Sequence, residues 1–331
     1  MTTKIPRLFK HIALAGLIFL VAISCNRSPS LDSLPPASEI QGFEETRLIQ
    51  HDLGETEIPV NPQRIATLMD ARLLAPAIAL GIKPIATTTY QADAGISFRG
   101  VTSEQVEGIE ILGNGHQPSL ERLLALKPDL ILADANLHKG IYGQLSAIAP
   151  TVALDLVLDG SSFKESFRRV AHVLNRDEKA EQLLGKYQAR VAQFKQRMGN
   201  RLNKLRISFI AVYGDPLWAL KSSDMVYEIF SDAGLKLIPI QEKMARSANI
   251  NFSLETLPQH DGDFLFIEKF PSESVNSIMN HPLWQQLNAI QSGRYAEVSP
   301  QRWYAISTST ANNILDDLFK YLAENPALEN I

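Results

Sequence analysis

The sequence predicts an α/β protein of two pseudo-symmetric lobes, each with a mostly parallel central sheet, joined by one long α-helix. Three observations support this fold class. Short apolar runs alternate with amphipathic stretches, which is typical of parallel sheets covered by helices. A long stretch of helical periodicity, from Asp177 to Gly199, occupies the middle of the chain. Short segments on its two sides nearly repeat one another.

The strands are expected where apolar, often β-branched residues form continuous runs. Strands covered on both faces have no exposed side, so their sequences show little polar alternation. The candidate strands are Arg64–Met69, Pro84–Thr88, Asp129–Ala133, Val152–Leu156, Ile207–Tyr213, Phe264–Glu268 and Tyr295–Val298.

The central helix has apolar residues on one face, which step by three, one, three, four, three and four positions. They are Ala180, Leu183, Leu184, Tyr187, Val191, Phe194 and Met198. At ~1.5 Å per residue this helix is ~34 Å long, enough to brace two lobes. A shorter helix precedes it, and Ser162 with Glu165 predicts a capping box at its start. A long core helix within a single domain is the alternative.

Two segments of the first half recur in the second half with the same spacing. Both pairs are 134 positions apart (119 to 253, 129 to 263), and each unit is predicted as a capped helix, a turn and a buried strand. A looser pair shares a Gly-x-Lys pattern. The matches are Ser119–Leu123 with Ser253–Leu257, Asp129–Leu132 with Asp263–Phe266, and Gly81–Lys83 with Gly234–Lys236.

The N-terminus is predicted to be an export signal over residues 1–24. Three basic residues precede the apolar run from Ile12 to Ser24, which is shorter than the ~20 residues that a membrane-spanning helix needs. Residues 22–25 resemble a bacterial lipoprotein signal, in which the cysteine is lipidated. Cys25 is the only cysteine, so it cannot form an internal disulfide. Ala22 stands where that pattern prefers Leu, so ordinary cleavage near Cys25 is the alternative.

Residues 25–41, rich in Ser and Pro, are predicted to be a disordered tether. Beyond them we expect an N-terminal lobe (42–160), linker helices (161–200) and a C-terminal lobe (201–331), with the binding domain over about 63–328. Loss of the three basic residues of the signal takes the formal net charge from −4 to −7. An acidic exported protein is a poor candidate for binding nucleic acid.

Several segments together resemble the periplasmic substrate-binding proteins of iron-siderophore and cobalamin ABC importers, the class whose lobes are joined by one helix. They are Arg64–Leu68, Leu80–Ile85, Pro118–Ile131, His281–Trp284, Ala289–Tyr295 and Leu315–Leu318. The resemblance implies a periplasmic, lipid-anchored monomer. It would capture a ferric siderophore, without a cofactor, and deliver it to a permease dimer with its ATPase. Alternative ligands are cobalamin, haem and a free metal ion.

The resemblance also implies that one acidic residue on each lobe docks onto the permease. The matching positions are Glu121 and Glu255, each next to the leucine that begins a repeated helix. Two carboxylates at pseudo-equivalent positions suit a pseudo-symmetric partner. A glutamate in the first turn of a helix is also favoured by the helix dipole, which is the alternative explanation.

The ligand cleft is expected beyond the carboxyl ends of the strands, where open α/β sheets bind ligands. Basic groups there would offset the charge of an anionic chelate, and aromatic rings would cover its flat surfaces. Trp218 and Trp303 as core residues, and Arg72 on a solvated helix face, are the alternatives. The predicted cleft residues are Arg72, Tyr90, Asn136, Tyr213, Trp218, Lys269, Trp303 and Tyr304, with Asp70 and His138 beside them.

Other chemistry finds little support in the sequence. The histidines show no metal-ligand spacing, so no direct metal site is predicted. No phosphate-binding loop, dinucleotide fingerprint or Gly-x-Ser-x-Gly elbow occurs, so we predict a binding protein and not an enzyme. An exported α/β hydrolase is the rival class. Gly115, just before the most specific segment of the resemblance, predicts that the backbone passes close to another group there.

Overall fold

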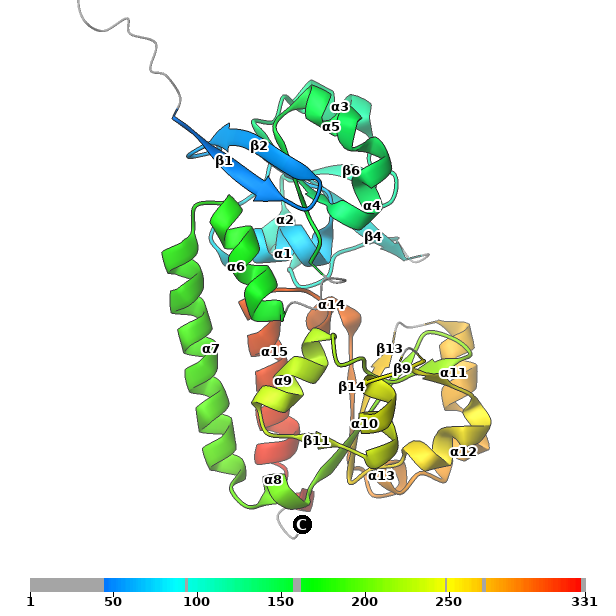
Figure 1. The fold of residues 1–331 in the computed structure, drawn as a ribbon. Coiled ribbons are helices and arrows are strands. Elements are labelled where there is room, and N and C mark those ends of the chain that lie inside the picture. Colours follow the sequence, from blue (N-terminus) through cyan, green and yellow to red (C-terminus); the bar gives the residue numbers. More distant parts are fainter. Residues whose placement is uncertain (1–44, 93–94, 157–161, 248, 270–271, 329–331) are drawn as a thin grey trace, which may run out of the picture. The chain divides into compact units, whose positions relative to one another are not determined.

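The computed structural model describes residues 45–328, apart from 93–94, 157–161, 248 and 270–271. The predicted signal, the tether and Cys25 lie outside the described residues. Within them are two separate six-stranded sheets, one in each lobe, and no helix long and apolar enough to cross a membrane. The predicted fold class is confirmed, because two mostly parallel α/β lobes are connected by a long helix (Figure 1).

The N-terminal lobe has five parallel strands in the order β6-β4-β3-β7-β8, and β5 pairs antiparallel with the end of β4. The strands are β3 (Ile65–Thr67), β4 (Ala86–Ala92), β5 (Gly95–Ser97), β6 (Glu110–Asn114), β7 (Leu130–Asp134) and β8 (Thr151–Leu154). The helices are η3 (Asp70–Leu74), α1 (Ala75–Ala79), α2 (Ser103–Val106), α3 (Leu120–Leu126), α4 (Ala135–His138), η4 (Lys139–Ile141) and α5 (Tyr142–Ile148).

In the C-terminal lobe the parallel strands follow the order β11-β9-β13-β14, and β10 and β12 add antiparallel pairing at one edge. The strands are β9 (Arg206–Val212), β10 (Leu217–Trp218), β11 (Lys236–Leu237), β12 (Asn251–Phe252), β13 (Phe264–Lys269) and β14 (Tyr295–Val298). The helices are α8 (Arg201–Lys204), α9 (Met225–Asp232), α10 (Pro239–Ala245), η5 (Leu254–His260), α11 (Glu273–Met279), α12 (Pro282–Gln285), α13 (Asn288–Gln291), α14 (Pro300–Trp303), α15 (Thr308–Leu318), η6 (Phe319–Ala323) and η7 (Pro326–Leu328).

All the strands expected from continuous apolar runs are present. β7 and β8 are buried along their whole length, whereas β14 alternates exposed and buried residues. The hairpin of β1 (Thr46–His51) and β2 (Gly54–Pro59) was not expected. Its sequence alternates instead: Ile58 is buried, whereas the glutamates of β2 are exposed. That period of two is the pattern of a sheet covered on one face only.

The repeat has a structural basis that is the same in both lobes. The Asp129 carboxylate accepts the backbone N–H of Arg64 (2.9 Å) just before β3, and Asp263 accepts the N–H of Arg206 (2.7 Å) at the start of β9. Each aspartate therefore fixes the register of two neighbouring parallel strands, β3 with β7 and β9 with β13. The repeated helices differ, because Pro258 lies inside η5 and an interior proline lacks the N–H that an α-helix requires.

Gly81 and Gly234 also occupy equivalent positions, each following the C-cap of a helix with φ near +80° (83° and 77°). The next residue in each lobe donates its backbone N–H to a carbonyl five positions earlier, Ile82 to Ala77 and Leu235 to Phe230 (both 2.9 Å). This arrangement at the C-terminal end of a helix requires the left-handed backbone conformation that glycine adopts most easily. It ends α1 and α9 with the same backbone geometry.

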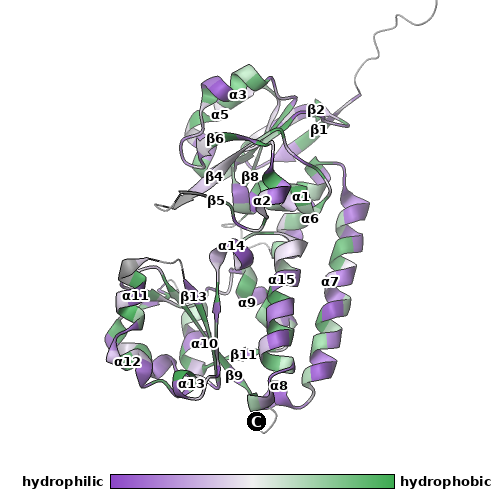
Figure 2. Ribbon diagram, turned by 180° about the vertical axis from the view of Figure 1, so that it is seen from behind, coloured by the Kyte–Doolittle hydropathy of each residue, from purple (hydrophilic) through white to green (hydrophobic). Residues whose placement is uncertain are grey.

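The linker consists of α6 (Phe163–Val173) and the 22-residue α7 (Asp177–Met198). Ser162 caps α6, since its hydroxyl accepts the N–H of Glu165 (3.1 Å). In α7 hydrophobic and hydrophilic residues alternate along its length (Figure 2). Its apolar face is the predicted one, and Tyr187 and Phe194 are fully buried. This face packs against α6 and α15, so α7 is braced by the C-terminal lobe along much of its length.

The lobes also meet through a second set of contacts, made by residues 300–306 of the C-terminal lobe. Gly100 donates its N–H to the carbonyl of Gln301 (2.7 Å), and Ile306 donates to the carbonyl of Ala71 (2.8 Å). Gly100 has φ +77°, and a Cβ there would stand 2.2 Å from the Cβ of Ala305. The contact therefore requires glycine on both steric and conformational grounds.

We predict that Gly100→Ala lowers the free energy of unfolding by about 2 kcal/mol or more, because the added methyl group forces the two lobes apart and strains the backbone. Denaturant unfolding followed by circular dichroism measures the change. The matched control is Gly140→Ala in η4, where nothing lies within 4 Å of the new Cβ, and there the change should stay within about 0.5 kcal/mol. Equal stability of the two variants would contradict the close packing of Gly100 against Ala305.

Candidate functional site

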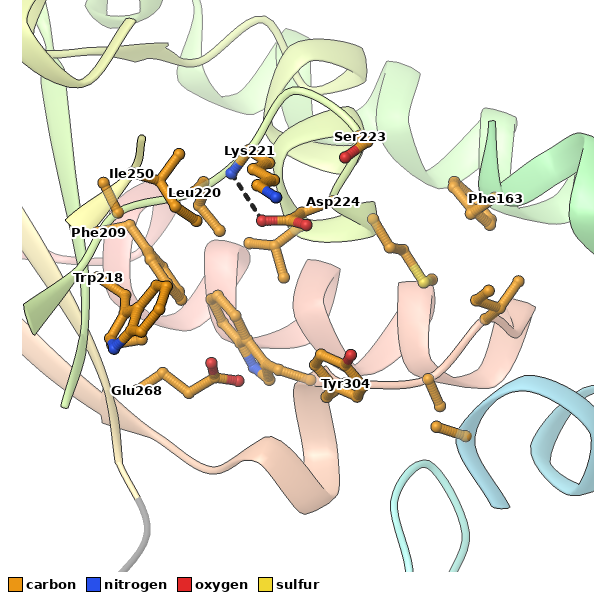
Figure 3. Close-up of a pocket in the computed structure, with 18 of the residues that line it drawn as sticks. Phe163, Phe209, Trp218, Leu220, Lys221, Ser223, Asp224, Ile250, Glu268 and Tyr304 are labelled. Carbon is orange, nitrogen blue, oxygen red and sulfur yellow. Dashed lines mark hydrogen bonds between the residues drawn. The ribbon is translucent and has the colours of Figure 1, made fainter. Parts of the chain in front are cut away.

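A cavity of about 350 Å³ lies at the carboxyl ends of β9 and β13, between the C-terminal lobe, α6 and the N-terminal lobe. This is the position at which open α/β sheets bind ligands. Arg72 and Ala71 contribute from the N-terminal lobe, and most of the wall belongs to the C-terminal lobe (Figure 3). The lining also includes Phe163, Ser166, Phe209, Tyr213, Trp218, Leu220, Lys221, Asp224, Ile250, Glu268, Trp303 and Tyr304.

Three partly exposed aromatic side chains border this cavity. Tyr213 follows β9, Trp218 lies in β10, and Tyr304 follows α14, with exposed fractions of 43%, 37% and 44%. Trp218 is positioned by antiparallel pairing with Ala211 of β9 and with Asn251 of β12. Large aromatic faces left exposed at a cavity provide stacking surface for a flat apolar ligand.

Trp303 also lines this cavity and is fully buried. Its indole N–H donates to the carboxylate of Asp317 (2.7 Å), and its ring packs among Phe209, Phe230 and Phe266. The side chain therefore forms part of the core that supports the cavity floor.

The cavity also contains two acids that the sequence analysis did not select. Glu268, near the end of β13, is only 5% exposed, and burial raises its pKa to about 7 although the hydroxyl of Tyr213 donates to its carboxylate. Burial likewise raises the pKa of Asp224, opposed by a hydrogen bond from the N–H of Lys221 (2.7 Å). The end-of-strand rule chose Lys269, one position beyond the residue that faces the cavity.

Arg72 projects from η3 toward the cavity and is held by an ion pair with Asp134, with 2.7 Å between Nη1 and Oδ2. Burial alone would lower the pKa of the guanidinium, but its hydrogen bond to Asp134 and the neighbouring charge raise the pKa overall. Tyr304 also interacts with this guanidinium. Arg72 is therefore a permanently charged group whose position is fixed from both lobes.

Asp70 is fully buried and does not reach the cavity. It accepts bonds from the backbone N–H, the Nε–H (3.0 Å) and the Nη2–H (2.6 Å) of Arg99. The Arg99 guanidinium in turn lies over the rings of Tyr90 (4.3 Å) and Tyr304 (4.8 Å). Arg99, which the sequence analysis missed, thus links a tyrosine of each lobe by cation–π contacts. Tyr90 is 42% exposed and lies outside the cavity lining.

The other predicted cleft residues also lie outside the lining of this cavity. Asn136 is exposed at the start of α4, and Lys269 pairs with Glu297 (2.9 Å). His138 is buried and bridges the Asp134 N–H (3.0 Å) and the carbonyl of Gly115 (2.8 Å). As ligand contacts, Asn136 and Lys269 stay predictions.

The backbone of Gly115 passes close to the side chain of Met69, as predicted. A Cβ on this residue would lie 3.0 Å from the sulfur of Met69. His138 holds the Gly115 carbonyl from the other side, so the loop after β6 is fixed against the start of η3. This loop therefore belongs to the scaffold of the N-terminal lobe.

The two predicted docking residues, Glu121 and Glu255, are exposed in the first turns of α3 and η5. Hydrogen bonds from Ser253 and from the backbone N–H lower the pKa of Glu255, so its carboxylate is charged at neutral pH. Within the described residues, no group of three or more His, Cys, Asp or Glu side chains is arranged to hold a metal ion.

Comparison with known proteins gives consistent matches. A family model described as periplasmic binding protein matches residues 87–301. The "probable siderophore-binding lipoprotein YfiY" of Bacillus subtilis is 28% identical, covering 94% of this chain and 98% of that protein. The "Fe(3+)-citrate-binding protein YfmC" of the same organism is 26% identical, covering 89% and 91%. The crystal structure of Staphylococcus aureus SirA complexed with staphyloferrin B matches with a TM-score of 0.70 and 26% identity over 84% and 98%.

The three tryptophans differ sharply in exposure, which gives a test of the cavity geometry without any ligand. Trp218 is 37% exposed, whereas Trp284 and Trp303 are buried. We predict that Trp218→Phe removes most of the fluorescence that acrylamide quenches, because a collisional quencher reaches only an exposed indole. Trp284→Phe is the control and should leave the quenchable fraction intact. Equal quenching of all three tryptophans by acrylamide would contradict the exposed position of Trp218 at the cavity.

Proposed function

Because the chain belongs to the periplasmic binding protein family, we propose that it captures a ferric siderophore, or a related ferric chelate, and delivers it to an ABC importer. The observation that carries the proposal is the aromatic-lined cavity at the carboxyl ends of β9 and β13. Its size falls within the range of small-molecule sites. The names of the relatives given above refer to siderophore binding, to Fe(3+)-citrate binding and to a complex with staphyloferrin B, which supports this class of ligand.

In this proposal the chelate contacts the exposed faces of Trp218, Tyr213 and Tyr304, and Arg72 donates hydrogen bonds to its oxygen atoms. Trp303 supports the wall from within the core. Tyr90, Asn136 and Lys269 contact only a ligand that extends beyond the cavity toward the N-terminal lobe. The protein binds without turnover and needs no cofactor.

Delivery requires a partner surface, and we propose that Glu121 and Glu255 provide it. Their equivalent positions in the two lobes suit a permease dimer with two basic pockets and an attached ATPase. A monomeric binding protein, anchored by lipid at Cys25 and tethered outside the cytoplasm, would stay close to such a permease. The contacts between the lobes favour little relative motion on loading, so recognition would depend on the ligand as well as on the two carboxylates.

Capture is tested by titrating the protein with ferric chelates extracted from iron-starved cells and following tryptophan emission. Trp218 borders the cavity, so ferric chelate binding should quench it, and Trp218→Phe should lose most of that signal. Mass spectrometry of the bound fraction identifies the ligand and separates a ferric siderophore from haem or cobalamin. Absence of any bound chelate, or turnover of an ester or amide substrate, would count against the proposal.

We predict that the double charge reversal Glu121→Lys, Glu255→Lys abolishes uptake of the ferric chelate by cells and leaves the Kd of the purified protein unchanged. Both side chains are exposed, so their replacement alters the surface charge and not the core. Glu178→Lys, on the exposed face of α7, is the control and should retain uptake. Transport at the normal rate by the double variant would exclude the docking role.

A further inference from the structure

The basic side chains that face the boundary between the lobes are already neutralised by acids of the protein. Arg72 pairs with Asp134 (2.7 Å), and Arg99 pairs with Asp70 (2.6 Å). Lys221 borders the cavity, is exposed, and forms no ion pair within the described part of the chain. The two arginines therefore offer a ligand little uncompensated positive charge, and Lys221 is the basic group of the described cavity lining that is left without an ion pair.

Glu268 differs from these paired groups. Its carboxylate accepts the Tyr213 hydroxyl, and no Lys, Arg or His among the described residues forms an ion pair with it. Figure 3 shows its carboxyl group pointing into the cavity, between Trp218 and Tyr304. Asp224 borders the same cavity and adds a second acid. A buried carboxylate without a cationic partner is unfavourable unless something else supplies the counter-charge.

We propose that the Glu268 carboxylate receives a cationic group of the cargo, so that the cavity selects ferric chelates that are neutral or carry a protonated amine over polyanionic ones. This inference rests on the proposed function. The neighbouring faces of Trp218 and Tyr304 would stabilise an ammonium group by cation–π attraction. A polyanionic chelate in the same place would meet like charge from Glu268 and Asp224, which works against its binding.

The test uses ferric chelates that differ in charge. Three hydroxamates cancel the charge of Fe³⁺, so a linear trihydroxamate with a free terminal amine forms a complex with one positive charge. Acetylation of that amine makes the complex neutral, and a ferric tris-catecholate carries three negative charges. Calorimetric titration at about pH 8, where the Glu268 carboxylate is mostly ionised and the terminal amine is still protonated, should give the tightest binding for the amine complex. Its acetylated form should bind about tenfold more weakly, because it lacks the contact with the carboxylate. The tris-catecholate should bind most weakly.

Glu268→Gln keeps the size of the side chain and an oxygen that can accept from Tyr213. In this variant the amine complex and its acetylated form should bind within about twofold of each other, because the charge contact is lost. Glu178→Gln removes one exposed carboxylate from α7 and should retain the full preference. Circular dichroism checks that each variant is folded. If Glu268→Gln does not fold, the comparison of the three chelates on the unaltered protein still tests the inference.

The outcomes separate this inference from the function on which it rests. Equal binding of the amine complex and its acetylated form by the unaltered protein, or tightest binding of the tris-catecholate, overturns the inference and leaves siderophore capture intact. An unchanged preference in Glu268→Gln likewise overturns it. If none of the three complexes binds, the inference fails, and if chelates from iron-starved cells also fail to bind, the proposed function fails with it.

Discussion

The buried ion pair between Asp70 and Arg99 is the interaction on which the placement of the cavity depends. Asp70 has no exposed surface and Arg99 only 6%, so removing either charge would leave the other unpaired, at a cost of about 3–5 kcal/mol. Their neighbours in sequence, Ala71 and Gly100, each form a backbone hydrogen bond with residues 301–306 of the other lobe. One ion pair thus fixes two segments of the N-terminal lobe against one segment of the C-terminal lobe.

That arrangement determines how a ligand meets the protein. Tyr304 lies in the same interlobe segment and is shared between the two lobes, because it contacts Arg99 and interacts with Arg72. On the far side α7 packs against α15, and Arg190 of α7 donates to the side chain of Asn312 (2.8 Å). Bending at the linker would therefore have to break contacts on both sides of the molecule. Such contacts favour a cavity that exists before the ligand arrives over one formed by hinge closure.

The sequence was most informative where local chemistry alone determines structure. Continuous apolar runs predicted the parallel strands, and the 134-residue offset predicted lobes that prove equivalent down to the contacts of Asp129 and Asp263. It was least informative where function depends on pairs that are distant in the chain. The partner of Asp70 is 29 positions away in a loop, and no local pattern identifies Arg99. The hairpin of β1 and β2 has the alternation of a half-covered sheet, which a search for continuous apolar runs overlooks.

The same limit applies to the cavity wall, where residue type does not reveal which way a side chain faces. Trp303 ends α14 and Trp218 ends β10, and both border the cavity, but Trp303 is buried among phenylalanines and Trp218 is partly exposed. Lys269 was chosen because it follows a strand, although successive residues of a strand point to opposite faces and it is Glu268 that borders the cavity. Only the three-dimensional arrangement separates such neighbours.

A comparison within the C-terminal lobe shows why the cavity carboxyl is best understood through binding. Gln241 is also buried, but its amide is satisfied by the protein: its oxygen accepts the Phe209 N–H (2.9 Å) and its nitrogen donates to the Phe209 carbonyl (3.0 Å). The fold can therefore bury a polar side chain at this sheet and satisfy it internally. Glu268 has only the Tyr213 hydroxyl as a donor among the described residues, and its remaining capacity faces the cavity. A polar group left incompletely satisfied at a cavity costs stability in the empty protein, and a ligand that completes its contacts recovers that cost on binding.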